Sequence, residues 1–260
     1  MKRRGWFVLS GLLALWCAFS GGTAQGLVGQ VSTRDVHALL WLPDGRIFLG
    51  HHDGLQVSED QGQTWRDLVR RVGFDAMHLV RDGERILAAG HWVYAESGDG
   101  GRSWRSLSPK GLPALDLHGY GVLPGRVHFV LEARYGYFRS QDGGRSFVPV
   151  SLKGLPRGEM AAMQALGQEL YVAPMGRGLY RSQNGGLSFE RVLSPEQEVY
   201  VLAAGGGRLY LGGRTGLWER TSAGWRRVWQ GAVLALAVHP EGGGGLVWVD
   251  EGGRIWRKLP

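Results

Sequence analysis

Hydrophobic and polar residues alternate along most of the chain in short runs, and glycine-rich segments separate the runs. Alternation with a period of two is typical of β-strands that bury one face. The first 35-residue unit predicts four strands, at Asp35–Leu42, Arg46–His51, Leu55–Glu59 and Thr64–Val69. The next unit predicts four more, at Asp75–Val80, Arg85–Gly90, Trp92–Ser97 and Ser103–Leu107. The pattern therefore predicts an all-β protein built from units of four short strands.

A short motif closes each of the first four units. It has the form S-x-[DN]-x-G-x-[ST]-[WF] and occupies Ser58–Trp65, Ser97–Trp104, Ser140–Phe147 and Ser182–Phe189. The terminal aromatic residues are 39, 43 and 42 positions apart. A repeat of about 40 residues is the spacing of one four-stranded propeller blade.

The composition of the motif predicts a tight turn. The serine hydroxyl and the aspartate carboxylate can accept hydrogen bonds from free N–H groups of the turn. Glycine supplies a left-handed backbone conformation, and the aromatic residue begins the next strand. Asn184 replaces aspartate in the fourth copy and can make much of the same bonding. We therefore expect all four motifs to be structural.

This motif resembles the Asp box of the BNR-repeat proteins, which include sialidases, sortilin-type receptors and photosystem II assembly factors. The resemblance covers nearly the whole chain after residue 24 and implies a β-propeller. We predict six blades in one domain over residues 25–260; five or seven blades fit the pattern less well. The predicted units are 35–69, 75–107, 114–150, 159–192, 198–229 and 232–260.

The fifth and sixth units lack the motif, and the sixth has only three predicted strands. Leu27–Val31 is strand-like and belongs to no complete unit. We therefore expect it to supply the outer strand of the sixth blade and to close the ring, which would remove exposed sheet edges.

The first 24 residues have the form of a signal peptide. Lys2, Arg3 and Arg4 precede an apolar run from Trp6 to Phe19, and Gly22–Ala24 offers small residues for cleavage. The alternative is an uncleaved N-terminal anchor. Cleavage after Ala24 would remove Cys17, the only cysteine, so no disulfide is expected in the mature chain. The sequence predicts an exported protein that contacts a membrane only through this segment.

Charge argues against one class of partner. The formal net charge is +7 and would fall to +4 without the first 24 residues. Arginines are scattered along the chain, without the basic run typical of nucleic-acid binding. We expect no nucleic-acid partner.

Function is expected on the face of the ring opposite the Asp boxes. In a four-stranded blade, the first and third turns share one face, and the second turn and the interblade loop share the other. The boxes are third turns. The second turns and interblade loops carry most of the histidines and all methionines beyond Met1, namely Met77, Met160, Met163 and Met175.

The first hypothesis for this face is a metal site at the mouth of the central channel. Imidazole and thioether groups suit copper, and imidazole with carboxylate suits zinc. Asp35 and Asp116 precede His37 and His118 by two residues, so each carboxylate could lie beside a ring. The alternative is that these side chains only pack within a crowded channel. The candidate ligands are His37, His51, His52, His78, His91 and His118.

The second hypothesis is glycoside hydrolysis. Arg134, Arg177 and Arg214 lie in successive units and could clamp a carboxylated sugar. Asp53, Glu132 or Tyr135 would then act as acid or nucleophile. Sialidases carry an Arg-Ile-Pro segment before the first Asp box, whereas this chain has Arg46-Ile47-Phe48. The alternative for each arginine is a solvated loop cation.

The third hypothesis is a binding module without catalysis. The loops are short, without an insertion that could build a lid or a deep pocket. We predict a monomeric scaffold that needs no cofactor and binds a protein, peptide or glycan through Trp92 and the three arginines. A sialidase-related glycosidase is the alternative.

Overall fold

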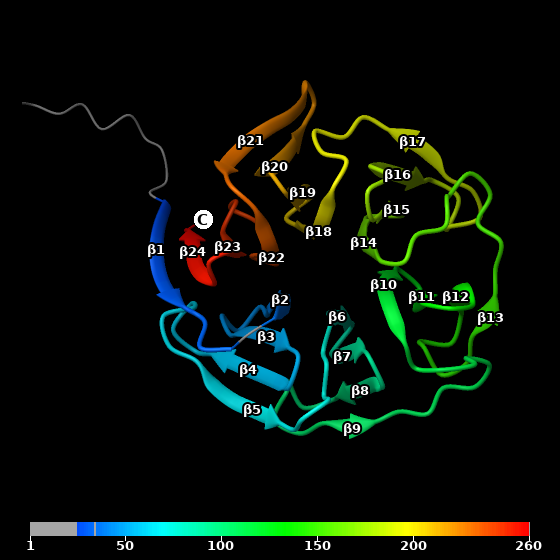
Figure 1. The fold of residues 1–260 in the computed structure, drawn as a ribbon, viewed down its shortest axis with the longest axis horizontal. Helices are drawn as coiled ribbons and strands as arrows, with labels where there is room; N and C mark the ends of the chain where they lie inside the picture. The colour runs from blue at the N-terminus through cyan, green and yellow to red at the C-terminus, as the bar shows by residue number, and fades with distance from the viewer. Residues whose placement is uncertain (1–24, 34, 260) are drawn as a thin grey trace, which may run out of the picture.

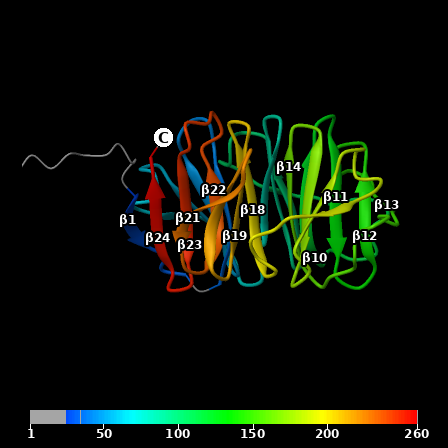
Figure 2. The same ribbon diagram turned by 90° about the horizontal axis from the view of Figure 1, so that it is seen from above.

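The computed structural model describes residues 25–33 and 35–259, and the predicted signal peptide lies outside them. These residues form 24 strands in six four-stranded antiparallel sheets. The sheets are arranged like blades around a central axis (Figure 1), and the ring is flattened when seen from the side (Figure 2). The predicted six-bladed propeller is confirmed.

In each of the first five blades, the four strands follow one another in chain order, from the innermost strand beside the central axis to the outermost strand. The first three blades contain β2 (Val36–Trp41), β3 (Ile47–His51), β4 (Gly54–Ser58) and β5 (Arg66–Arg70); β6 (His78–Asp82), β7 (Arg85–Gly90), β8 (Val93–Ser97) and β9 (Arg105–Ser106); and β10 (Leu117–Leu123), β11 (Val127–Glu132), β12 (Gly136–Ser140) and β13 (Val148–Pro149). The next two contain β14 (Ala161–Leu166), β15 (Glu169–Pro174), β16 (Leu179–Ser182) and β17 (Glu190–Val192); and β18 (Val199–Gly205), β19 (Arg208–Gly213), β20 (Gly216–Thr221) and β21 (Gly224–Gln230).

The last blade combines both ends of the chain. It contains β22 (Val233–Val238), β23 (Leu246–Asp250) and β24 (Arg254–Lys258), and β1 (Gln25–Gln30) pairs antiparallel with β24 as the outer strand. Leu27 lies opposite Trp256, and Val28 and Val31 pack against the core between blades one and six. The predicted closure by the N-terminal strand is confirmed.

The core lies between neighbouring blades. The second strand of each blade is almost wholly buried, because it is covered on both faces by adjacent sheets. Phe48 of blade one packs on Gly101 of the second Asp box, where a Cβ would collide with its ring. Phe129 and Gly186 repeat this contact between blades three and four. These box glycines are therefore needed for interblade packing as well as for their positive φ of 86° and 82°.

Each Asp box makes the bonds that its composition predicts. In the second box, Ser97 Oγ accepts the N–H of Gly101 at 2.7 Å. Asp99 Oδ1 accepts the N–H groups of Arg102 and Ser103, both at 2.9 Å. Trp104 Nε1 donates to the carbonyl of Gly101 at 3.2 Å. The expected structural role of the boxes agrees with this geometry.

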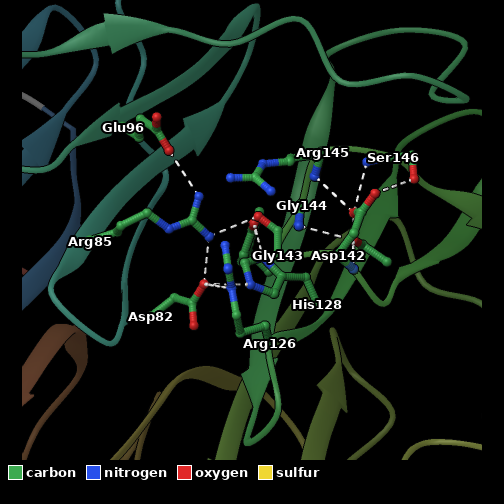
Figure 3. A network of polar contacts seen from close by, with 12 residues as sticks. Asp82, Arg85, Glu96, Arg126, His128, Asp142, Gly143, Gly144, Arg145 and Ser146 are labelled. Carbon is green, nitrogen blue, oxygen red and sulfur yellow. Dashed lines mark hydrogen bonds and ion pairs between the residues drawn. The ribbon is translucent and has the colours of Figure 1, made fainter.

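The contribution of the Asp-box carboxylate to stability can be tested at Asp142 in the third box (Figure 3). Asp142 accepts hydrogen bonds from Ser146, Ser140 and the backbone, which lower the pKa of its carboxyl far below the ordinary value. Asp142→Ala should therefore lower the melting temperature, since the turn N–H groups lose their acceptor. Asp142→Asn should keep most of the stability, because Asn184 bonds Ser188 in the fourth box at 3.0 and 2.8 Å.

Thermal unfolding followed by circular dichroism at neutral pH measures this difference. A depressed carboxyl pKa gives stability that is present above its ordinary value of 3.8 and lost as the pH falls through the folded value. The two variants should therefore converge with the wild type in strong acid. Equal melting temperatures for the alanine and asparagine variants at neutral pH would contradict a hydrogen-bonding role.

Candidate functional site

The two faces of the ring have different contents. The third turns hold the Asp boxes, and the first turns lie beside them: Arg126 and Arg85 both contact Gly143 of the third box. We call this side the box face. The second turns and the interblade loops form the opposite side, which we call the loop face.

A cavity of about 510 Å³ follows the central axis. The inner strands of the blades line it, mostly with apolar side chains such as Leu40, Val80 and Val122. Polar side chains enter it near the loop face, where His37, His78 and His118 contribute to the wall.

Asp75 lies at the centre of the polar cluster on this face. It belongs to the loop between β5 and β6, and its side chain is 4% exposed. His37 Nε2 is 3.2 Å from Asp75 Oδ1, and His52 Nδ1 is 3.2 Å from Asp75 Oδ2. His91 Nε2 lies 3.9 Å from Asp75 Oδ2. Three histidines from blades one and two thus surround one buried carboxylate.

Two glycines hold Asp75 in this position. The loop before β6 is wedged between the ends of β3 and β7, where Gly50 and Gly90 stand. A Cβ at Gly50 would collide with the carbonyl oxygen of Ala76, and one at Gly90 with that of Asp75. Ala76 N also donates to His51 O at 3.3 Å. The backbone around Asp75 is therefore fixed by close contact with both blades.

A second carboxylate continues the cluster into blade three. His91 Nδ1 is 2.5 Å from Asp116 Oδ1, and His118 Nε2 is 3.1 Å from the same oxygen. The two imidazole rings meet edge to face at 4.7 Å. His118 Nδ1 lies 2.8 Å from the carbonyl oxygen of Glu159, at the start of blade four. We call the set His37, His52, Asp75, His91, Asp116 and His118 the channel-mouth cluster.

Burial and charge act in opposite directions within this region. Burial opposes the charge on Asp75, but the close imidazole rings of His37, His52 and His91 leave the pKa of its carboxyl below the ordinary value. Burial lowers the pKa of His78 to about 4, and it also lowers the pKa of His51. Asp75 is thus an anion at neutral pH, and His51 and His78 are neutral bases.

Unpaired polar atoms concentrate here. In residues 25–33 and 35–259, ten buried side-chain nitrogen or oxygen atoms lack a hydrogen-bond partner. Five belong to this region: His37 Nε2, His51 Nε2, Asp75 Oδ1, His78 Nε2 and His118 Nε2. Because buried polar atoms in folded proteins are nearly always paired, each of these atoms calls for a partner such as an ordered water or an ion.

The structure brings together four of the six histidines predicted as metal ligands. His37, His52, His91 and His118 belong to the channel-mouth cluster. His51 is buried in its own turn, where its Nδ1 accepts the N–H of Asp53 at 3.2 Å. His78 lines the channel.

The carboxylate partner of His37 differs from the sequence-based expectation. Asp35 has a left-handed φ of 56°, precedes the first residue of β2 and is exposed. His37 instead faces Asp75 of the next blade. The expected pairing of Asp35 with His37 is therefore wrong, because alternation predicts shared faces only within a continuous strand. Asp116 and His118 do lie together, as expected.

The residues proposed for glycoside hydrolysis are held by their own turns. Glu132 is completely buried, and its Oε2 accepts the N–H groups of Arg134 and Tyr135 at 2.9 and 2.7 Å. Asp53 Oδ1 accepts the N–H of Gly73 at 3.2 Å, and Tyr135 is exposed. Glu132 thus caps the turn between β11 and β12.

Trp92 and the three arginines lie exposed on the loop face. Arg214 pairs with Glu198 at 3.4 Å. In the part of the chain that the structure describes, no carboxylate lies within ion-pair distance of Arg134 or Arg177. Trp92 is 73% exposed and has a left-handed φ of 58°.

Comparisons with known proteins identify the fold. No protein-family model matches the sequence, and no curated protein matches it. The fold resembles a Bacteroides thetaiotaomicron protein of unknown function (9% identity, 92% of this chain and 72% of that one, TM-score 0.71). It also resembles a Xanthomonas campestris gluconolactonase (13% identity, 91% of this chain and 89% of that one, TM-score 0.68). A third similar structure is YCF48 bound to D1 peptide (16% identity, 91% of this chain and 96% of that one, TM-score 0.56). At these identities the likeness concerns the fold alone.

The described residues contain no helix with the length and apolar character needed to cross a membrane.

Proposed function

We propose that the chain is a binding module that holds a peptide segment of a partner protein on its loop face. The main observation in favour of this proposal is that Trp92 is exposed and has a left-handed backbone conformation. A left-handed backbone is rare for a bulky residue and costs about 1–3 kcal/mol. Trp92 N donates to Leu115 O at 2.7 Å, and its neighbour His91 bridges to Asp116. Strain that holds a tryptophan out in water is best explained by a partner that covers it.

Further exposed side chains lie on the loop face. Val72, Tyr135 and Met175 are 92%, 62% and 43% exposed and belong to the interblade loop or second turns of blades one, three and four. Arg134 and Arg177 stand beside the last two. Tryptophan, tyrosine, methionine and arginine are the residues enriched at protein interfaces. The matching ligand is a peptide with an apolar side chain and a carboxylate.

The structure of YCF48 with a bound D1 peptide supports this proposal, because it shows that a propeller of similar fold can hold a peptide. The signal-peptide-like start supports a location outside the cytoplasm, so we propose that the partner is an exported or membrane-exposed protein.

Trp92→Ala should weaken peptide binding at least about tenfold, the effect of losing an aromatic hot spot. A random peptide library selected on the immobilised full chain supplies the probe, and fluorescence polarisation with the best-selected peptide gives the affinity. Leu187→Ala is the matched control, because Leu187 is 63% exposed but stands in the fourth Asp box. Failure to select any peptide, or equal loss in both variants, would contradict the proposal.

The glycosidase alternative stays a prediction. A panel of fluorogenic glycosides tests it with the wild type, Asp53→Asn and Glu132→Gln. Turnover that disappears in Asp53→Asn, while the fold is kept, would replace the binding proposal with a catalytic one.

A further inference from the structure

The geometry points to a zinc site on the loop face, formed by His37, His52, Asp75 and His91 and oriented by Asp116. The site would tie blade one to blade two. It stands on different residues from the peptide contacts above, so either proposal can fail without the other.

Three of the donors already have the spacing of metal ligands. The nearest atoms of His37, His52 and Asp75 all lie within 4.8 Å of one another. Two ligands bound at 2.0–2.1 Å to a tetrahedral zinc ion are about 3.3 Å apart. His37 Nε2 lies 3.2 Å from Asp75 Oδ1, and His52 Nδ1 lies 3.2 Å from the other oxygen, Asp75 Oδ2, so each imidazole has this spacing to one oxygen of the carboxylate.

These atoms are close without being hydrogen-bonded. His37 Nε2 and Asp75 Oδ1 are both buried and both lack a hydrogen-bond partner, although they are 3.2 Å apart. At 3.2 Å the two atoms are within ion-pair distance, but neither is satisfied as a hydrogen-bond donor or acceptor. A cation between them would pair both at once.

His91 has the arrangement of an oriented fourth ligand. Its Nδ1 contacts Asp116 Oδ1 at 2.5 Å, the contact made by an Nδ1–H tautomer whose Nε2 is free to bind a metal. Nε2 lies 3.9 Å from Asp75 Oδ2, on the side of the site. A carboxylate behind a metal-binding histidine fixes the tautomer and the ring orientation in this way.

The nature of the donors favours zinc. Imidazole nitrogen with one carboxylate suits a borderline ion, whereas calcium and magnesium prefer oxygen ligands throughout. The converging set contains no thioether, which argues against copper(I). The Asp75 side chain is 4% exposed, so its polar oxygens need partners within the cluster, and His52, at 58% exposed, gives an ion access from solvent.

Zinc titration of the full chain after chelator treatment tests the inference. A chromophoric zinc chelator as competitor should report one tight site per chain. His52→Gln removes an exposed ligand, and Asp75→Asn removes the central charge. Asp116→Asn, which leaves every proposed ligand in place, should lower the zinc affinity about 10- to 100-fold. Each of the other two variants should lower it further. His239→Gln is the matched control, because His239 packs against Trp41 away from the cluster.

A second readout separates loss of metal from loss of fold. Zinc should raise the melting temperature of the wild type and His239→Gln, because it binds only the folded state, and should leave His52→Gln unchanged. Circular dichroism without zinc should be alike for all variants. The inference is overturned if the wild type binds no zinc tightly, if His52→Gln keeps wild-type affinity, or if His239→Gln loses it equally.

Discussion

Replacing Trp248 with alanine should lower the free energy of unfolding by about 3–5 kcal/mol, the range for removing a buried aromatic side chain. Trp248 is completely buried in β23. Its ring stacks on Trp256 at 6.4 Å and meets Trp229 of blade five edge to face at 5.9 Å. The cavity would open in the blade where the two chain ends meet, so we expect ring closure itself to weaken.

Urea denaturation followed by tryptophan fluorescence and circular dichroism measures this effect. Trp248→Phe is the matched control. The indole Nε1 of Trp248 is buried without a hydrogen-bond partner, so phenylalanine keeps an aromatic ring and removes an unpaired donor. Its loss of stability should be much smaller than that of the alanine variant. A loss of unfolding free energy below about 1 kcal/mol for Trp248→Ala would show that the contacts among Trp229, Trp248 and Trp256 do not stabilise the last blade.

Replacing Arg85 with methionine should cost about 3 kcal/mol of stability, as expected when one partner of a buried ion pair is removed. Arg85 Nη2 donates to Asp82 Oδ2 at 2.5 Å and to Gly143 O at 2.8 Å, and Nη1 donates to Glu96 Oε2 at 2.9 Å (Figure 3). The side chains of Asp82 and Glu96 are only 9% and 13% exposed. Removing the guanidinium would leave Asp82 to His128 and Arg126 and Glu96 to Arg105, and would remove the hydrogen bond from blade two to Gly143 of blade three.

The same network predicts a pH dependence. Burial opposes the charge on Asp82 and Glu96, but hydrogen bonds and positive charge leave the pKa of both carboxyls below their ordinary values of 3.8 and 4.5; they come from Arg85 and His128 at Asp82, and from Arg105 and Arg85 at Glu96. This stability is present above the ordinary values and is lost as the pH falls through the folded ones. The gap between wild type and Arg85→Met should therefore be largest at about pH 7 and should shrink as the pH falls below the ordinary values of 3.8 and 4.5.

Arg181→Met is the matched control for the arginine. Arg181 is 22% exposed against 21% for Arg85, but its partners Glu169 and Glu190 are 27% and 58% exposed. Solvent should screen that pair, so its loss should cost about 1 kcal/mol or less. Equal losses of stability in Arg85→Met and Arg181→Met would mean that the burial of the partner carboxylates does not determine how much an arginine contributes.

The sequence was sufficient to predict the fold because its repeats are local. The spacing of Trp65, Trp104 and Phe147 sets the blade length, and the unassigned strand near Leu27 supplies the strand missing from the last blade. Each of these features depends only on residues close in the chain or on a count of strands. The positive φ of the box glycines also follows from the motif itself.

The site could be predicted only in part, because its contacts cross from one blade to the next. His37 and Asp75 are 38 positions apart, and alternation within a strand cannot show that they meet. One signal for Asp75 was present: an acidic residue stands at or just before the inner strand of five units, at Asp35, Asp75, Asp116, Glu159 and Glu198. The capping role of Glu132 depends on the conformation of a turn and could not be read from its type alone.

Anomalous X-ray scattering from crystals of the zinc-loaded chain tests the channel-mouth site most directly. Data collected above and below the zinc absorption edge locate the ion without reference to the protein density. We predict one strong peak on the loop face, bounded by His37 Nε2, His52 Nδ1, the Asp75 carboxylate and His91 Nε2. Absence of a peak there, or a stronger one elsewhere on the chain, would contradict the account.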